Sequence, residues 1–368
     1  MIQHQKTEFI VEKWLDDSNK VVGLDPLGFD DKLGLLHLMN KRNDTREIIQ
    51  LLYRSLPNPD ILDSFSYEES LAAMRDLGIF IGTLKKHGIE PVEVVPELEY
   101  VLLVLMVKTD LPPRDTLLHY TTWNPSDTRI RTYTGLTDEI SLIESVRKAI
   151  PGLMRSIAQL EMLHERPLHG HEFGVICKDV KEMMEGMVEG IVHAKRCVSP
   201  AVFANELRFY YDPIKVDYNK DYIGPGAVEM PMFVFDHLLW SSDCEDEAYS
   251  SFKEGYLPYN MSFIRDIYWR FDRTPSLLTR VEQNLRDERS DEHFRAALSV
   301  LELCSVLKRF RMPHKKVAEA AYSQGEEQYH DKGSGGYSTN ILLHIIALQN
   351  ERIKALQDVV GKVQVKNI

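Results

Sequence analysis

One histidine, His314, stands out because the residues on its side of the predicted helix are small. Each residue of an α-helix advances about 100°, so Ala318, Ala321 and Gly325 fall within roughly 40° of His314. A flat macrocycle could lie close to such a backbone, beside an imidazole that serves as a single axial ligand to haem iron. The same spacing is also typical of a histidine that only packs or lies at the surface.

The residues just before His314 add to the haem interpretation. Arg311 lies one turn earlier, where its guanidinium could bind a haem propionate through charge-assisted hydrogen bonds. Pro313 has no N–H, so it leaves the carbonyl of Arg309 as an acceptor near the second ring nitrogen of the histidine. Two alternatives remain open: Arg311 forms a surface ion pair, or Pro313 separates two helices and leaves His314 at the surface.

A different metal centre is suggested by two Glu-x-x-His pairs, Glu161 with His164 and Glu327 with His330. Helical di-iron oxygenases use this spacing, but they need two further inward glutamates, which are not evident in the sequence. Two other histidines in apolar helical segments are interpreted as buried, hydrogen-bonded core residues: His237 and His344.

Several blocks of the sequence resemble the monodechloroaminopyrrolnitrin synthase family, which belongs to the indoleamine and tryptophan dioxygenase superfamily of haem proteins. The resemblance runs almost end to end, and the blocks together are highly specific. It implies haem b bound by His314, an opposite face open to dioxygen, and a small indole amino acid as substrate. The blocks are residues 72–78, 111–119, 133–136, 224–231, 255–258 and 309–337.

The resemblance also assigns a substrate pocket. Phe203 suits the face of an indole ring, and the guanidinium fork of Arg208 suits an amino-acid carboxylate. Ser334 and Gly335 lie in a glycine-rich loop similar to the one that closes over substrate in the superfamily, with the Ser334 hydroxyl as a catalytic group. Tyr322 is the other expected catalytic residue, although it lies about 12 Å along the helix from the histidine.

Structural alternatives exist for Phe203, Arg208 and the glycine-rich loop. Phe203 is also explained as core, Arg208 as a surface residue, and the glycine loop as an ordinary cap of the last helix. The reaction implied by the family is oxidative rearrangement of tryptophan or a chlorinated tryptophan into a phenylpyrrole, with loss of the carboxyl group and with an external electron donor. The wider superfamily implies indole-ring cleavage instead, and a non-enzymatic haem sensor is a further alternative.

Composition sets outer bounds on function. The chain has 368 residues and a formal charge of −12, which argues against a nucleic-acid partner. Its four cysteines are far apart in sequence and are expected to be reduced, as in a cytoplasmic protein. The N-terminus is polar, and the longest apolar run, residues 100–107, is far shorter than the roughly 20 residues of a membrane-spanning helix. We therefore expect neither membrane nor nucleic acid as partner.

Helical periodicity dominates the sequence and predicts an all-α, multi-helix haem-binding bundle of the indoleamine dioxygenase type. Short strand signals appear only at residues 92–95 and 129–134. The Pro- and Asn-containing connection at 108–136 predicts a smaller N-terminal helical part, residues 1–125, and a larger haem-binding domain, residues 126–368. Helices are predicted at residues 48–56, 71–84, 140–163, 180–198, 294–310 and 341–363, with helix-start signals at Asn43, Ser199 and either Ser338 or Thr339.

Overall fold

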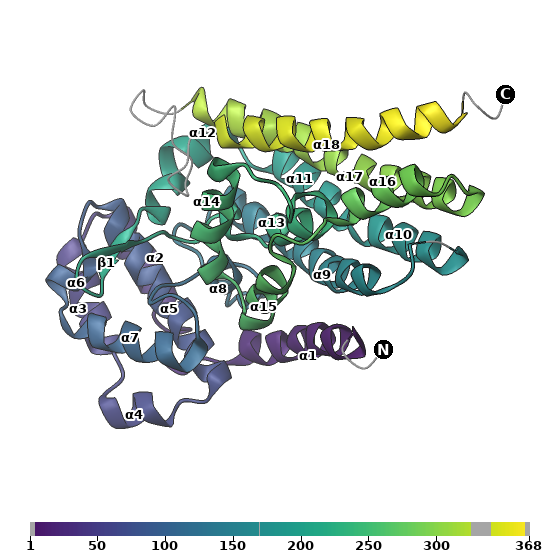
Figure 1. Ribbon diagram of the computed structural model, residues 1–368. Helices are drawn as coiled ribbons and strands as arrows, with labels where there is room; N and C mark the ends of the chain where they lie inside the picture. Colours follow the sequence, from purple (N-terminus) through teal and green to yellow (C-terminus); the bar gives the residue numbers. More distant parts are fainter. Residues whose placement is uncertain (1–3, 169, 325–339, 365–368) are drawn as a thin grey trace.

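The computed structural model describes residues 4–168, 170–324 and 340–364, and it confirms the predicted all-α fold. Figure 1 shows long helices stacked at one side of the molecule and shorter helices gathered at the other. Within the described residues, strands are confined to one antiparallel hairpin, formed by β1 (Ile214–Val216) and β2 (Lys220–Tyr222).

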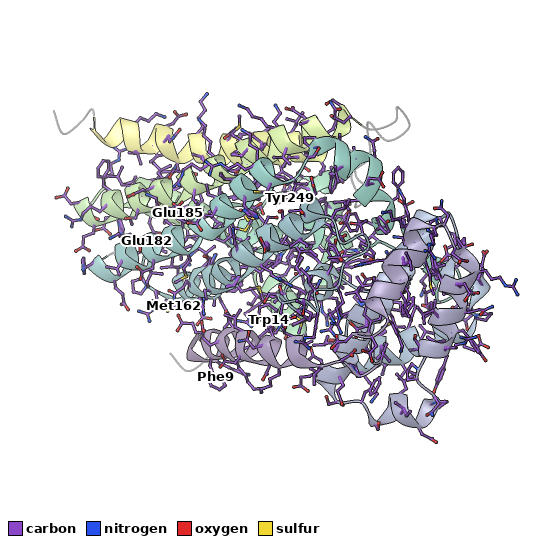
Figure 2. All side chains as sticks on the ribbon, turned by 180° about the vertical axis from the view of Figure 1, so that it is seen from behind. Phe9, Trp14, Met162, Glu182, Glu185 and Tyr249 are labelled. Carbon is purple, nitrogen blue, oxygen red and sulfur yellow. The ribbon has the colours of Figure 1, made fainter. Side chains whose placement is uncertain are left out.

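The larger part is a bundle of long helices to which the first helix also belongs. α1 lies along α9, with Trp14 buried against the bundle and Phe9 on the outer face (Figure 2). The Trp14 ring is 6.4 Å from Phe263 and 6.5 Å from Trp123, which ties α1 to later parts of the chain. The bundle helices are α1 (His4–Gly23), α9 (Thr137–Glu165), α10 (His171–Met183), α11 (Glu185–Cys197), α16 (Leu277–Asp287), α17 (Asp291–Tyr322) and α18 (Asn340–Gln364).

The smaller part is organised around α5, which is buried from Ser70 to Leu84. A helix that is buried on nearly every side lies in a core, and shorter helices surround this one. Its start is fixed by a capping box in which Ser66 accepts a hydrogen bond from the Glu69 N–H and the Glu69 carboxylate accepts one from the Ser66 N–H. The surrounding helices are α2 (Leu33–Lys41), α3 (Thr45–Ser55), α4 (Pro59–Ser64), α6 (Pro91–Val94), α7 (Glu97–Thr109) and α8 (Leu117–Tyr120).

A connecting region of short elements joins the two parts and includes two π-helices. π-helical turns are uncommon and are often found at functional sites. The region contains α12 (Pro200–Val202), the π-helix η1 (Phe203–Leu207), the 3-10 helix η2 (Arg208–Tyr211), η3 (Ala227–Glu229), α13 (Met232–Asp236), the π-helix η4 (His237–Ser241), α14 (Glu247–Tyr256), η5 (Leu257–Tyr259) and α15 (Ser262–Phe271).

Neither of the two short strand signals corresponds to a strand in the structure, for identifiable reasons. Residues 91–94 form the short helix α6, which begins at Pro91 in the first helical position. Residues 129–134 lie in a connection whose backbone donors bond to side chains instead of a neighbouring strand. The N–H of Arg131 donates to Asn124, and the N–H of Tyr133 donates to Glu139.

The helix predictions are confirmed except that residues 180–198 are divided at Met184 into α10 and α11. Ser199 caps α12 as predicted, with its Oγ accepting from the Val202 N–H. Asn43 does not serve as a cap, since Asp44 occupies the N-cap position of α3 without a side-chain cap bond. Ser338 and Thr339 lie outside the described residues.

The apolar core consists of two clusters that do not divide the chain at a single point. The larger cluster combines α1 and residues of α5 and α8 with much of the chain from α9 onward, and the smaller one combines α2–α7 with residues that include Ile143 of α9 and Leu207 to Val216. The domain boundary at residue 125 therefore stays a prediction. The two parts pack against each other through α1 and the segment around η2.

Candidate functional site

The helix that carries His314 is α17, which begins at the Ser290 cap and continues without a break through Pro313. The alternative in which Pro313 separates two helices is therefore not found. The first part of α17 buries an apolar stripe that includes Ala297, Val300 and Leu307. Beyond residue 311 this packing changes: His314, Val317 and Ala318 are only half-buried. The face with the small residues is thus less completely covered than the rest of the helix.

His314 has the properties of an imidazole available to a metal. Its ring is half-buried and lies nearly parallel to the Phe310 ring, with ring centres 5.5 Å apart. Among the described residues, neither ring nitrogen has a hydrogen-bond partner. Burial, followed by the nearby charge of Arg311, lowers the pKa of His314 to about 4. The imidazole is therefore neutral at pH 7, the form in which histidine binds metals, so the residue fits an axial ligand of haem.

Arg311 is not a surface residue, because only 4% of it is exposed. Its guanidinium donates to the carboxylate of Asp236 and to the side-chain oxygen of Gln349. The predicted propionate contact would use the donors that these two partners leave. A buried arginine one turn from His314 thus links α17 to both α13 and α18, through a charged acceptor on α13 and a neutral one on α18.

Asp236 is the centre of this network, and the sequence reasoning did not identify it. It accepts hydrogen bonds from Trp240 Nε1 at 2.9 Å and from the Tyr249 hydroxyl at 3.0 Å, in addition to Arg311. Figure 2 places Tyr249 inside the bundle. The sequence signal was an aspartate within the apolar run Phe233–Leu239, because a buried carboxylate requires partners.

Phe203 and Arg208 begin two consecutive irregular turns near the end of α17. Phe203 opens the π-helix η1 and is half-buried, with its ring 6.5 Å from that of Tyr211. Arg208 opens η2 and is buried, so the surface alternative is wrong for this residue. The Asn205 amide donates to the carbonyl of Gln324 at 3.3 Å. The segment is therefore in contact with the helix that carries His314.

Buried charges hold this segment in place. Arg114 is fully buried and donates to the carbonyl of Asp212 at 2.5 Å, directly after η2, and to that of Tyr222 at 3.3 Å. Glu229 accepts from the Leu117 N–H at 2.6 Å. Two of the sequence blocks, residues 111–119 and 224–231, therefore meet around the segment that positions Arg208.

A third sequence block, residues 72–78, closely contacts the block at residues 111–119. Gly78 of α5 lies so near Asp115 that an added Cβ would be 2.3 Å from the Asp115 Cγ atom. In the neighbouring charged cluster, Asp76 pairs with Arg75 at 2.8 Å and with Arg131 at 2.9 Å, and all three are buried. Residues far apart in the chain thus come together in buried polar clusters on and beside α5.

The family model for monodechloroaminopyrrolnitrin synthase PrnB matches residues 29–366 of this chain. The chain belongs to this family. The match covers every block on which the resemblance was based, from residue 72 to residue 337. The expected reaction class is therefore confirmed as that of the synthase family, the ring rearrangement step of pyrrolnitrin biosynthesis.

Three residues expected in the synthase pocket cannot be placed. Tyr322 is the last residue of α17, but its side chain is not among those described. Ser334 and Gly335 lie outside the described residues. Of the other expected site residues, the structure describes His314 and Arg311 on α17, and the Phe203–Arg208 segment that contacts the chain near the end of that helix.

The first Glu-x-x-His pair does not fit a di-iron site, because both of its side chains have other partners. Glu161 is bonded to Arg270, and His164 Nε2 donates to the carbonyl of Leu238 at 2.8 Å. No three metal-binding side chains come together anywhere in the described ranges. The second pair, Glu327 and His330, falls outside them.

The two remaining helical histidines have different environments. His237 is a core residue as predicted, stacked on Tyr268 with ring centres 4.2 Å apart and with Nδ1 3.2 Å from Lys253 Nζ. His344 is not buried; its Nε2 pairs with Asp246 at 2.9 Å on a partly exposed face. All four cysteines are free, and no described helix is long and apolar enough to span a membrane.

Proposed function

We propose that this protein is a haem b enzyme that converts a tryptophan chlorinated on its ring into a phenylpyrrole, with dioxygen as co-substrate. Membership in the synthase family supports the reaction class. The observation that carries the haem assignment is the imidazole of His314, which is neutral, half-buried and without a hydrogen-bond partner among the described residues. Such a side chain is suited to ligate iron from one side.

When bound, haem would supply oxidative chemistry with dioxygen. The chain's own contribution is to hold the group in place. His314 would hold the iron through a ring nitrogen, and the small side chains of Ala318 and Ala321 would leave room for the group beside α17. The buried Arg311–Asp236 pair keeps the orientation of that helix fixed, so the imidazole is preorganised.

The substrate would be held by the segment that contacts the end of α17. Arg208 offers a planar fork for the amino-acid carboxylate, and Phe203 offers an apolar face for the indole. Ser334, Gly335 and Tyr322 complete the proposed pocket, with the two hydroxyls directed to substrate or dioxygen. Closure of the glycine loop would exclude water from the reaction.

The net reaction is an oxidation. Conversion of 7-chlorotryptophan to the aminophenylpyrrole removes the carboxyl group as carbon dioxide together with two hydrogen atoms, so two electrons leave the substrate. Dioxygen is the proposed acceptor, and an external electron donor would supply the further electrons that its full reduction to water requires.

Mass analysis of products tests the proposal. Haem-reconstituted protein with 7-chlorotryptophan, reductant and dioxygen should yield a product that lacks the carboxyl group. A product that keeps the carboxyl group and gains two oxygen atoms would instead establish ring cleavage. Absence of turnover of either kind, with haem bound, would favour a haem sensor and contradict the proposal.

A matched pair of substrates tests the role of Arg208. The variant Arg208→Lys keeps the charge but loses the fork, so we expect KM for 7-chlorotryptophan to rise at least tenfold, which is about 1.4 kcal/mol of binding free energy. Binding of 7-chlorotryptamine, which has no carboxylate, should be unchanged. Equal weakening of both compounds would exclude a carboxylate contact at this residue.

A further inference from the structure

A cleft of about 510 Å³ lies where the end of α9 meets the loop between α15 and α16. Small-molecule sites usually measure about 300 to 1,000 Å³. Residues that line this cleft include His164, Phe271, Arg280, Gln283 and Asn284. The wall of the cleft includes His164, the histidine of the first Glu-x-x-His pair.

Packing alone does not explain why Arg280, a charged residue, is half-buried at this cleft. It is half-buried, its Nη1 donates to the carbonyl of His164 at 2.6 Å, and burial lowers its pKa. No carboxylate lies within ion-pair distance of it in the described part of the chain. Burying a guanidinium without a counter-charge is unfavourable, so the cleft is suited to bind an anionic group.

Arg147 provides an internal comparison, because burial also lowers its pKa. Three of its N–H groups are, however, used: they donate to the backbone carbonyls of Thr121, Asn124 and Pro125. Arg280 makes a single such bond and leaves further N–H groups at the cleft. The difference indicates that Arg280 is more than a cap of the α9 terminus.

The rest of the lining defines the charge and shape of an occupant. The charge of Arg270 is balanced by Glu161, so Arg280 leaves the cleft with an excess of one positive charge. The rings of Phe271 and His164 lie together, with centres 4.7 Å apart. Burial lowers the pKa of His164 to about 4, so this ring adds a flat neutral surface at pH 7.

We propose that this cleft binds a small organic carboxylate with a flat apolar body. The carboxylate would accept paired hydrogen bonds from the Arg280 fork, assisted by the neutral amides of Gln283 and Asn284. The apolar body would pack against Phe271 and the His164 ring. This site is separate from the proposed substrate pocket, whose carboxylate partner is Arg208.

Isothermal titration calorimetry of the full chain with benzoate tests the proposal, with benzamide and inorganic phosphate as comparison probes. Benzoate should bind, and both comparison probes should bind at least tenfold more weakly. The variant Arg280→Gln should weaken benzoate binding at least tenfold. Arg286→Gln is the matched control, since Arg286 lies on the same helix, pairs with Glu282 on the surface and should leave binding unchanged.

Two further variants make the outcome decisive. Gln283→Glu adds a negative charge to the lining without removing the bond from Arg280 to His164, and it too should weaken benzoate binding at least tenfold. Arg208→Lys should leave this binding unchanged, which separates the cleft from the proposed substrate pocket. Binding lost in Arg208→Lys but kept in Arg280→Gln, or tighter binding of phosphate than of benzoate, would overturn the proposal.

Discussion

Replacing Asp236 with asparagine should destabilise the protein by about 3–5 kcal/mol, the cost of breaking a buried ion pair from one side. Asp236 and Arg311 are both nearly inaccessible to water, with 1% and 4% of their surfaces exposed. The substitution keeps a similar shape and one acceptor oxygen, but it leaves the buried Arg311 guanidinium without its counter-charge. Trp240 and Tyr249 would also compete for the remaining oxygen.

Urea unfolding followed by circular dichroism measures this effect. With a slope of about 3 kcal/mol per molar urea, the unfolding midpoint should fall by roughly 1–2 M. The matched control is Asp243→Asn, because Asp243 pairs with Arg352 on a partly exposed face and should cost less than about 1 kcal/mol. The double variant Asp236→Asn with Arg311→Met should recover part of the loss, since it leaves no unpaired charge. Equal midpoints for Asp236→Asn and Asp243→Asn, or no recovery in the double variant, would refute the reasoning.

Two further substitutions test the buried polar clusters in the same way. Gly78→Ala should lower stability by about 1–3 kcal/mol or more in thermal unfolding, because the added Cβ would be 2.3 Å from Asp115 Cγ, whereas Gly34→Ala adds a Cβ in open space on α2 and should be neutral or stabilising. His119 is buried, and burial followed by the charge of Arg75 lowers its pKa to about 3. As the pH falls from about 6.5 towards 3, the unfolded chain therefore takes up a proton that the folded chain does not, and this residue removes about 1.4 kcal/mol of stability per pH unit. His119→Gln should remove that dependence, so its stability should fall less steeply than that of the wild type over this range; parallel curves would contradict the assignment.

Local sequence patterns predicted the helices well because a buried stripe at helical spacing is a local property. The position of His314 within a helix followed from the small residues around it, which needs no knowledge of the rest of the fold. The two short strand signals did not become strands, because their backbone N–H groups had other hydrogen-bond acceptors. At Tyr133 that acceptor is Glu139, a side chain on the following helix.

The partners of the site residues could not be predicted in the same way. Arg311 and Asp236 lie 75 residues apart, so nothing in the local pattern of either residue names the other. A buried aspartate in an apolar run signals that some cation must approach, but not which one. The same holds for Arg280, whose missing counter-charge becomes visible only when the surfaces of α9 and α16 are brought together.

Whether His314 binds the haem iron is tested by the absorption spectrum of the protein reconstituted with haem b. We expect a Soret band in the wild type and in the control variant His344→Ala, which removes a partly exposed histidine. His314→Ala should lose that band or shift it, and added imidazole should restore it. A His314→Ala variant that binds haem with an unchanged spectrum would show that His314 is not the iron ligand.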